Sequence, residues 1–400
     1  MKLLINASNI HIAGPLQVAI SVIHELKHFP DHEYYLYLSA EVENQIDLEQ
    51  LPANFHIYRF SGYARGKSWL SRGWMLIRRL RRSALLEKVI NPDAVFTVFG
   101  PIYWKPKSPH LAGYAIPFSI YKESPYFKEV PRFELLKRKL INQIRTQFFL
   151  HNTDHLVVET DEVRERMIKS FAINPDRISV VSNTVSNIYY QPAAWSDKIT
   201  LPPRIPGEVR LITVSANHLY KNLSIIDPVI TLFRKLKPEL KIKFILTVQP
   251  EQLKISKENL KYIHFAGPIK VNECPHLYRQ CDFMFLPSLL DCFSATYPEA
   301  MKMGLPILTS DLPFARNVCK DAAVYFDPVN PEDIVRKIIS VVNDPVKGAK
   351  MIAYGKRQLS SFETATSRVE KYLKLAEELM ISVRADERGL QNIITTPPLQ

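Results

Sequence analysis

Residues 290–301 read LDCFSATYPEAM, and this stretch carries the clearest signal of the fold in the chain. The apolar run FMFLP at 283–287, typical of a buried β-strand, precedes it, and a helical pattern follows it. Two carboxylates, Asp291 and Glu299, lie on either side of seven residues. A strand, an acidic loop and a helix in this order predict a ligand site at the carboxyl end of a parallel strand, where open α/β sheets usually bind their ligands.

The chemistry of this stretch suits a sugar nucleotide. A helix that begins near Thr296 points backbone N–H groups and the positive end of its dipole at an anion such as a phosphate. A carboxylate in the first turn can accept hydrogen bonds from a pair of sugar hydroxyls. We therefore expect the residues between the two carboxylates to bind substrate, namely Phe293, Ser294, Ala295 and Thr296. The alternative is purely structural: Glu299 caps its helix and Asp291 is an ordinary loop residue.

The stretch resembles the retaining glycosyltransferases of family 4 (glycosyl transferases group 1), which have the GT-B fold. That family has a Glu, seven residues and a second Glu, usually with a Gly-Phe-Gly core; this chain keeps the spacing, Phe293 and Glu299. It departs from the pattern at Asp291, Cys292, Ser294 and Thr296. The resemblance implies sugar transfer from a nucleotide-diphosphate sugar without a metal or other cofactor. It also implies that Glu299 holds the ribose and that Asp291 holds the donor sugar.

Lys221 is the third predicted catalytic residue beside Asp291 and Glu299. It lies in SANHLYKN, residues 215–222, where a loop after a strand enters a helix and a cation can neutralise a diphosphate. Members of the family that the chain resembles place a Lys in the same context. The alternative is that Lys221 is a solvated surface residue without a role in binding.

Two glycine turns are weaker candidates. Gly14 follows the first strand and precedes Pro15, so backbone can approach the donor diphosphate, as in relatives that have two or three glycines there. A second turn, Gly267, Pro268 and Ile269, is expected to face the nucleotide base. Neither turn matches a dinucleotide fingerprint or a phosphate-binding P-loop, which argues against a dehydrogenase or an NTPase.

Strand-like and helix-like runs alternate along the 400 residues, which predicts an α/β protein with two doubly wound parallel-sheet domains. A proline-rich stretch at 201–207 suits a linker. We predict a first domain at 1–193, a second, nucleotide-sugar-binding domain at 194–361, a helix at about 362–383 that packs back on the first domain, and a tail at 384–400.

Composition limits the location of the protein. Neither a signal-peptide pattern nor an apolar run of about 20 residues, the length that spans a bilayer, is found in the sequence. The four cysteines show no metal-type spacing and are typical of a cytoplasmic protein with reduced thiols.

The positive charge is concentrated in one part of the chain. Residues 59–145 hold 18 Lys and Arg against 5 Asp and Glu, a surplus of 13 within a net charge of +12. The predicted helix at 70–89 combines apolar residues at helical spacing with arginines, the composition of a helix that lies on an anionic membrane. The expected membrane-binding residues are Trp69, Trp74, Arg78, Arg79, Arg81 and Arg82. The alternative is a helix that packs its apolar stripe on the sheet, and without a matching motif nucleic acid is not an expected partner.

These features together predict a cytoplasmic glycosyltransferase held peripherally at the inner face of the cell membrane. Its donor is a nucleotide sugar, and its acceptor is a lipid-linked or polysaccharide glycan in cell-surface synthesis such as lipopolysaccharide or capsule. The alternatives are a non-catalytic protein that binds sugar nucleotide or partners, and a sugar-nucleotide epimerase.

Overall fold

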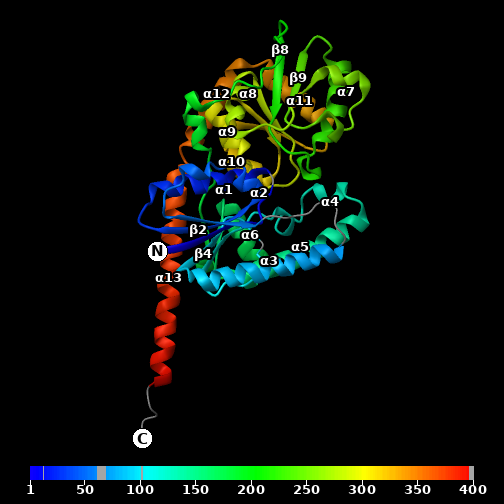
Figure 1. The fold of residues 1–400 in the computed structure, drawn as a ribbon. Helices are drawn as coiled ribbons and strands as arrows, with labels where there is room; N and C mark the ends of the chain where they lie inside the picture. The colour runs from blue at the N-terminus through cyan, green and yellow to red at the C-terminus, as the bar shows by residue number, and fades with distance from the viewer. Residues whose placement is uncertain (12, 61–68, 101, 396–400) are drawn as a thin grey trace. The chain divides into compact units, whose positions relative to one another are not determined.

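The structure is a computed structural model, and it describes residues 1–11, 13–60, 69–100 and 102–395. The chain forms two compact units. Unit 1 comprises Met1–Ala115, Lys139–Ser182 and Ala365–Gln400, and unit 2 comprises Ile116–Arg138 and Asn183–Thr364. Each unit has one parallel sheet with flanking helices, which can be followed in Figure 1 and confirms the predicted fold class.

The sheet of unit 1 has seven parallel strands in the order β3-β2-β1-β4-β5-β6-β7. Its strands are β1 Lys2–Ala7, β2 Glu33–Ser39, β3 Phe55–Phe60, β4 Ala94–Thr97, β5 His110–Gly113, β6 His155–Val158 and β7 Ile178–Val180. Its helices are α1 Ala13–Glu25, α2 Ala40–Glu43, α3 Trp69–Ile90, most of α5 Arg132–Asn152, α6 Asp161–Phe171 and α13 Ala365–Thr395. The central strands β1 and β4 are buried on both faces, as expected for a parallel sheet covered by helices.

Two apolar clusters occupy the two faces of this sheet. Leu3 and Ile5 of β1 pack with residues of α1 and α13. Leu4, which alternates with them, packs with Tyr37 and Val95 in a cluster that the inner side of α3 adjoins.

Helix α13 is part of the core of unit 1. Val369, Tyr372 and Leu373 belong to its main cluster, and the buried Arg368 donates to Ser21 of α1. The helix begins at Ala365 and continues to Thr395, so the predicted end near 383 and the predicted tail at 384–400 are wrong as far as Thr395. The remaining residues lie outside the described part of the chain.

The sheet of unit 2 has six parallel strands in the order β10-β9-β8-β11-β12-β13. Its strands are β8 Glu208–Thr213, β9 Lys241–Leu246, β10 Ile263–Phe265, β11 Phe283–Leu286, β12 Ile307–Ser310 and β13 Ala323–Phe326. Its helices are α4 Tyr126–Glu129, α7 Ile226–Leu236, α8 Cys274–Arg279, α9 Thr296–Met303, α10 Pro313–Cys319, α11 Pro331–Val342 and α12 Pro345–Leu359. The apolar faces of α7 and α11 pack together over one side of the sheet.

Unit 2 includes a segment that the predicted boundary assigns to the first domain. Residues 116–138, named here the arm, pack with unit 2, which resumes at Asn183 rather than at the predicted 194. Ser124 Oγ of the arm donates to the carbonyl of Leu289 over 2.5 Å. The reason for the difference is long-range packing, because nothing in the arm's own composition marks a change of unit.

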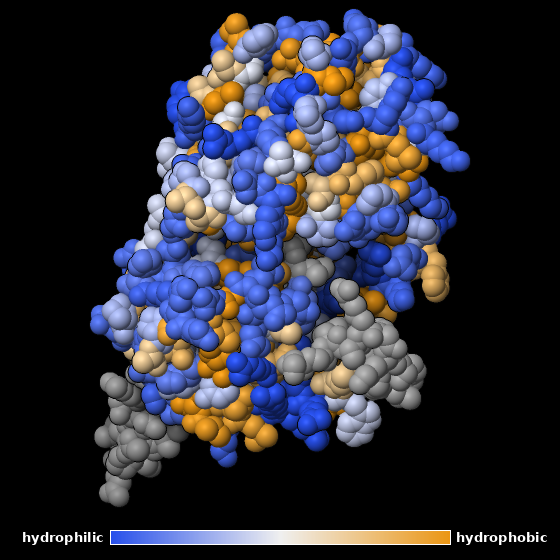
Figure 2. Space-filling view, turned by 45° about the horizontal axis from the view of Figure 1, so that its top comes forward, coloured by the Kyte–Doolittle hydropathy of each residue, from blue (hydrophilic) through white to orange (hydrophobic). Residues whose placement is uncertain are grey.

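Apolar surface is visible among the charged residues of these units. The view in Figure 2 shows hydrophobic residues exposed beside hydrophilic ones on the face turned to the reader. Within the described ranges, no helix is both long enough and apolar enough to cross a membrane.

Candidate functional site

The predicted site in unit 2 lies at the point where the strand order reverses. β8 and β11 are neighbours, and the later strands continue outward from each of them. Such a switch point leaves a crevice outside the carboxyl ends of the two strands, where doubly wound sheets bind ligands. Lys221 follows β8 and Asp291 follows β11, so the fold brings two predicted residues, 70 positions apart, to one place.

Lys221 and Asp291 form a direct ion pair. Lys221 Nζ lies 2.6 Å from Asp291 Oδ2, and their side chains are only 14% and 17% exposed. The other oxygen, Asp291 Oδ1, accepts from the backbone N–H of Cys292 over 3.0 Å. The ion pair holds the Lys221 ammonium in a defined position before a ligand binds. The site is therefore preorganised for an anionic ligand.

A stack of aromatic rings supports the loop that carries Lys221. The ring of Tyr220 stacks on His218 at 5.1 Å between centroids and meets the Phe118 ring of the arm edge-on at 5.7 Å. The carbonyl of Tyr220 accepts from the N–H of Leu289 over 2.7 Å, which ties this loop to the one that carries Asp291. Burial, reinforced by Lys221, lowers the pKa of His218, so its ring is neutral at neutral pH. Sequence reasoning missed the roles of Tyr220 and Phe118, because Phe118 reaches the site only through the arm.

Helix α9 begins where the sequence predicts, at Thr296. Ser294 Oγ and Thr296 Oγ1 are 3.0 Å apart, and the carbonyls of Ser294 and Ala295 accept the first N–H bonds of the helix. The first turn of an α-helix directs further N–H groups outward along its axis. Phe293 differs from the other predicted substrate-binding residues, because its ring is buried against Phe362 and serves packing.

Glu299 lies one turn into α9, in a pocket lined by tyrosine hydroxyls. Tyr278 donates to Glu299 Oε2 over 3.1 Å, and the buried Tyr189 hydroxyl lies beside the same carboxyl group. Burial raises the pKa of Glu299 to about 7, partly offset by the hydrogen bond from Tyr278. No sequence signal singles out Tyr189 or Tyr278, because both reach Glu299 only through tertiary packing.

The turn of Gly267, Pro268 and Ile269 follows β10, at the edge of the same sheet. Gly267 has φ +72, a left-handed conformation that favours glycine, and it is buried next to Gln249. Pro268 is exposed and Ile269 partly buried. The requirement for glycine is thus explained by the backbone alone.

Gly14 lies in unit 1 at the equivalent reversal, since it follows β1, which neighbours β4. It is exposed, and a Cβ atom built on it meets nothing within 4 Å. The position leaves room for a ligand, but its contribution to diphosphate binding stays a prediction.

The six residues predicted to bind membrane all belong to α3. Trp74, Arg78, Arg81 and Arg82 are exposed, and the Arg82 guanidinium lies 4.9 Å from the centre of the Phe60 ring. The side chain of Trp69 lies outside the described residues. Arg79 differs from the other three arginines, because it is half-buried and donates to the carbonyl of Ser8.

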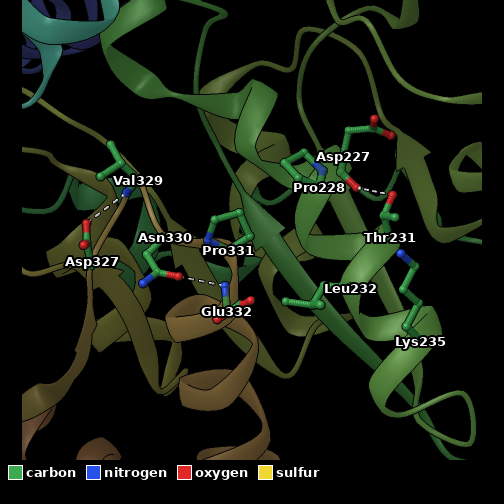
Figure 3. Close-up of a pocket in the computed structure, with 10 residues that line it drawn as sticks. All are labelled: Asp227, Pro228, Thr231, Leu232, Lys235, Asp327, Val329, Asn330, Pro331 and Glu332. Atoms are coloured by element: carbon green, nitrogen blue, oxygen red, sulfur yellow. Dashed lines mark hydrogen bonds between the residues drawn. The ribbon is translucent and has the colours of Figure 1, made fainter.

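A groove between α7 and α11, shown in Figure 3, holds none of the predicted site residues. Its polar groups already serve the local structure: Asp227 accepts from Ser256 and Asn259, and Asn330 caps α11 by accepting from the N–H of Glu332. We therefore place the candidate site at α9. Among the described residues, no three His, Cys, Asp or Glu side chains gather as ligands for a metal ion.

Residues 204–358 match the family model of glycosyl transferases group 1. A curated relative, D-inositol 3-phosphate glycosyltransferase of Corynebacterium glutamicum (strain R), is 25% identical over 183 residues, which are 42% of this chain and 43% of the relative. The match thus spans less than half of that relative's length.

Solved structures match over nearly the whole chain. A glycosyltransferase from Rickettsia africae ESF-5 has a TM-score of 0.64 at 17% identity and covers 95% of this chain and 98% of its own. The Anabaena protein Alr3699/HepE, in complex with UDP and glucose, has a TM-score of 0.62 at 13% identity and covers 94% of this chain and 100% of its own. At such identities the likeness shows the fold, which is GT-B. Residues 204–358, which include Lys221, Asp291 and Glu299, therefore form a glycosyl transferases group 1 domain within a chain of the GT-B fold.

Proposed function

We propose that this protein is a retaining, metal-independent glycosyltransferase of family 4. It would move a sugar from a nucleotide-diphosphate sugar to a lipid-linked or polysaccharide acceptor in cell-surface glycan synthesis. The observation that carries the proposal is the grouping of the Lys221–Asp291 ion pair, the first turn of α9 and the half-buried Glu299 at the β8/β11 switch point, all within the matched domain.

Each part of the site suits one part of the donor. Glu299 can accept hydrogen bonds from the two ribose hydroxyls, because a carboxylate has two acceptor oxygens. The first turn of α9 and Lys221 suit the diphosphate. Asp291 suits hydroxyls of the donor sugar, and the UDP and glucose named in the HepE complex fit this division.

The transfer follows from charge that develops on the leaving group. As the bond from the anomeric carbon to the diphosphate breaks, negative charge grows on the phosphate oxygen. Lys221 and the α9 N–H groups stabilise that charge. The acceptor hydroxyl attacks the same face, forms the new bond to the anomeric carbon and gives its proton to the departing diphosphate. The protein's contribution is electrostatic stabilisation and orientation of the two substrates.

Ligand binding and turnover test the proposal directly. Titration calorimetry with UDP, GDP, ADP and their sugars, with and without EDTA, is expected to find one nucleotide that binds equally well in both conditions. Glu299→Ala should weaken that binding about a hundredfold, since loss of a charged hydrogen-bonding group costs about 3 kcal/mol. Glu258→Ala, which removes an exposed carboxylate of the same unit, is the matched control and should bind as the wild type does.

Two outcomes would contradict the proposal. If no nucleotide binds, the donor site is wrong. If a sugar nucleotide binds and is converted or epimerised without any acceptor, the site is right and the reaction class is wrong.

A further inference from the structure

Helix α5 turns its apolar stripe away from the protein. Its inward side is marked by the buried Thr146, Phe149 and Asn152. The exposed large apolar residues recur at helical spacing on the opposite side and are Phe133, Leu136, Leu140, Ile141, Ile144 and Phe148. Phe133 is 82% exposed. An ordinary surface helix turns its apolar stripe toward the core and its polar side toward solvent. The exposed apolar stripe of α5 is therefore unusual.

Helix α3 repeats this arrangement. Its buried residues Ser83, Glu87 and Ile90 mark the inward side. The large apolar residues opposite them are exposed, and they include Trp74, which is 70% exposed, and Leu85.

Both helices carry a surplus of basic residues. α3 has six Lys and Arg against one acid, and α5 has five against one. Both acids are already used: Glu87 accepts from Trp104 and from the N–H of Lys107, and Glu134 pairs with Arg138. Arg78 and Arg81 are exposed and share the outward side of α3 with Trp74.

Both helices pack on the same loop of unit 1. Trp104 Nε1 donates to Glu87 of α3, and Asn152 of α5 donates to the carbonyl of Ile102 over 2.9 Å. Phe148, at the margin of the exposed side of α5, also meets the ring of Tyr103 edge-on. Since the inward sides of α3 and of the unit 1 part of α5 meet one loop, the outward sides of these two segments are exposed on the same side of unit 1.

We propose that the outward sides of α3 and α5 together bind the surface of an anionic lipid bilayer. The structure shows that both helices expose apolar residues on their outward sides, and it separates Arg78 and Arg81, which face outward, from Arg79, which donates to the carbonyl of Ser8. This inference does not depend on the reaction that the protein catalyses.

The combination of charge and apolar area selects lipid over other partners. A second copy of the chain would bring two basic faces together, which like-charge repulsion opposes. Nucleic acid would neutralise the arginines but leave Trp74, Leu140 and Ile144 in water. A bilayer with anionic headgroups satisfies both, because amphipathic helices bury apolar side chains at the acyl boundary while Lys and Arg meet the headgroups.

Vesicle sedimentation with the full chain tests the proposal. The vesicles contain phosphatidylcholine alone or phosphatidylcholine mixed with phosphatidylglycerol, and the protein should partition only to the mixed ones. Replacing Arg78 and Arg81 with Gln should weaken partitioning about thirtyfold, since each basic residue near an anionic surface contributes about 1 kcal/mol. The variant L140S/I144S should weaken it by at least as much.

Matched controls come from exposed positions of unit 2. The pair Lys254→Gln and Lys257→Gln removes the same charge, and the pair Leu236→Ser and Val346→Ser removes exposed apolar side chains. Both controls should partition like the wild type. Trp74 provides a second readout, because its fluorescence should shift to the blue on anionic vesicles, and the shift should be smaller in Trp74→Phe than in the wild type.

Three results would overturn the proposal. The first is a wild type that does not partition to anionic vesicles. The second is equal loss in the controls and in the α3 and α5 variants. The third is a wild-type dimer that the L140S/I144S variant cannot form, which would assign the face to a second copy. Glu299→Ala should partition normally, so failure of the donor site and failure of this face are distinguishable.

Discussion

The α9 site and the outward sides of α3 and α5 differ from an ordinary protein in opposite ways. The first shields charged groups from water, and the second exposes large apolar side chains to it. At α9, a carboxyl group and an ion pair are shielded from water, and each has defined partners in Tyr278, Lys221 and Asp291. On α3 and α5, large apolar side chains such as Trp74 and Phe133 are exposed beside arginines.

Neither departure helps the fold. Burying charge costs desolvation energy, and exposing apolar area gives up hydrophobic stabilisation. Both are therefore best explained by something that is absent from the isolated chain: a polar ligand at α9, and an apolar, anionic surface at α3 and α5.

The largest expected effect separates the two sides of a single helix. Phe149→Ala should lower the free energy of unfolding by about 3–5 kcal/mol, because the ring is buried against Tyr114 and the backbone at Gly100. Leu140→Ser, on the outward side of α5, should change it by less than about 0.5 kcal/mol. Urea unfolding of both variants measures the contrast. Similar losses would mean that the outward side of α5 is packed and not available to lipid.

An intermediate effect is expected for the coupling energy of the ion pair between Lys221 and Asp291. A double-mutant cycle of Lys221→Met and Asp291→Asn should give a coupling energy of about 1–2 kcal/mol, since both side chains are mostly shielded. The exposed pair of Lys237 and Glu239, at 3.5 Å, is the control and should give about 0–0.5 kcal/mol. Equal coupling energies in the two cycles would mean that the pair of Lys221 and Asp291 behaves as an ordinary surface ion pair and not as part of a preorganised site.

The last expected effect is the pH dependence that Glu299 imposes. Its pKa in the folded protein is about 7, above the ordinary 4.5, so the folded state holds the proton more tightly than the unfolded chain does. Stability should therefore fall as pH rises from about 4.5 to about 7, and Glu299→Gln should lack this fall. Thermal midpoints of both proteins across this range measure it.

The same proton opposes donor binding. If the ionised carboxylate binds the ribose, affinity at about pH 6 should be about tenfold weaker than at about pH 8, because only about a tenth of the groups are ionised one unit below the pKa. The nucleotide affinity of Glu299→Gln should be low and independent of pH. A wild-type affinity that does not change with pH would argue against a role for Glu299 in holding the ribose.

Local patterns predicted much of the fold and one half of the site. Buried parallel strands such as β1 and β11 form continuous apolar runs, and the acidic loop marked the start of α9 correctly. The edge strand β3, with the sequence FHIYRF, lacks such a continuous apolar run. An amphipathic pattern gives the period of a helix but not which side meets the core, so the exposure of the α5 stripe had to come from the structure.

Partners brought together by tertiary packing could not be predicted. Tyr189 and Tyr278 approach Glu299 from distant parts of the chain, and Phe118 reaches Tyr220 through the arm. Contacts between residues that are distant in the sequence produce no local pattern from which a single sequence could predict them.

The place of α13 in the core of unit 1 has a consequence for biosynthesis. Val369, Tyr372 and Leu373 of α13 complete a cluster that contains Leu3 and Ile5 of β1, so β1 lacks these packing partners until α13, more than 350 residues later in the chain, has been synthesised. During that interval unit 1 exposes apolar surface, while most of unit 2 is made in one stretch and depends on its own continuous segment and the earlier arm. We therefore expect nascent chains that stop before residue 365 to require chaperones or to be degraded.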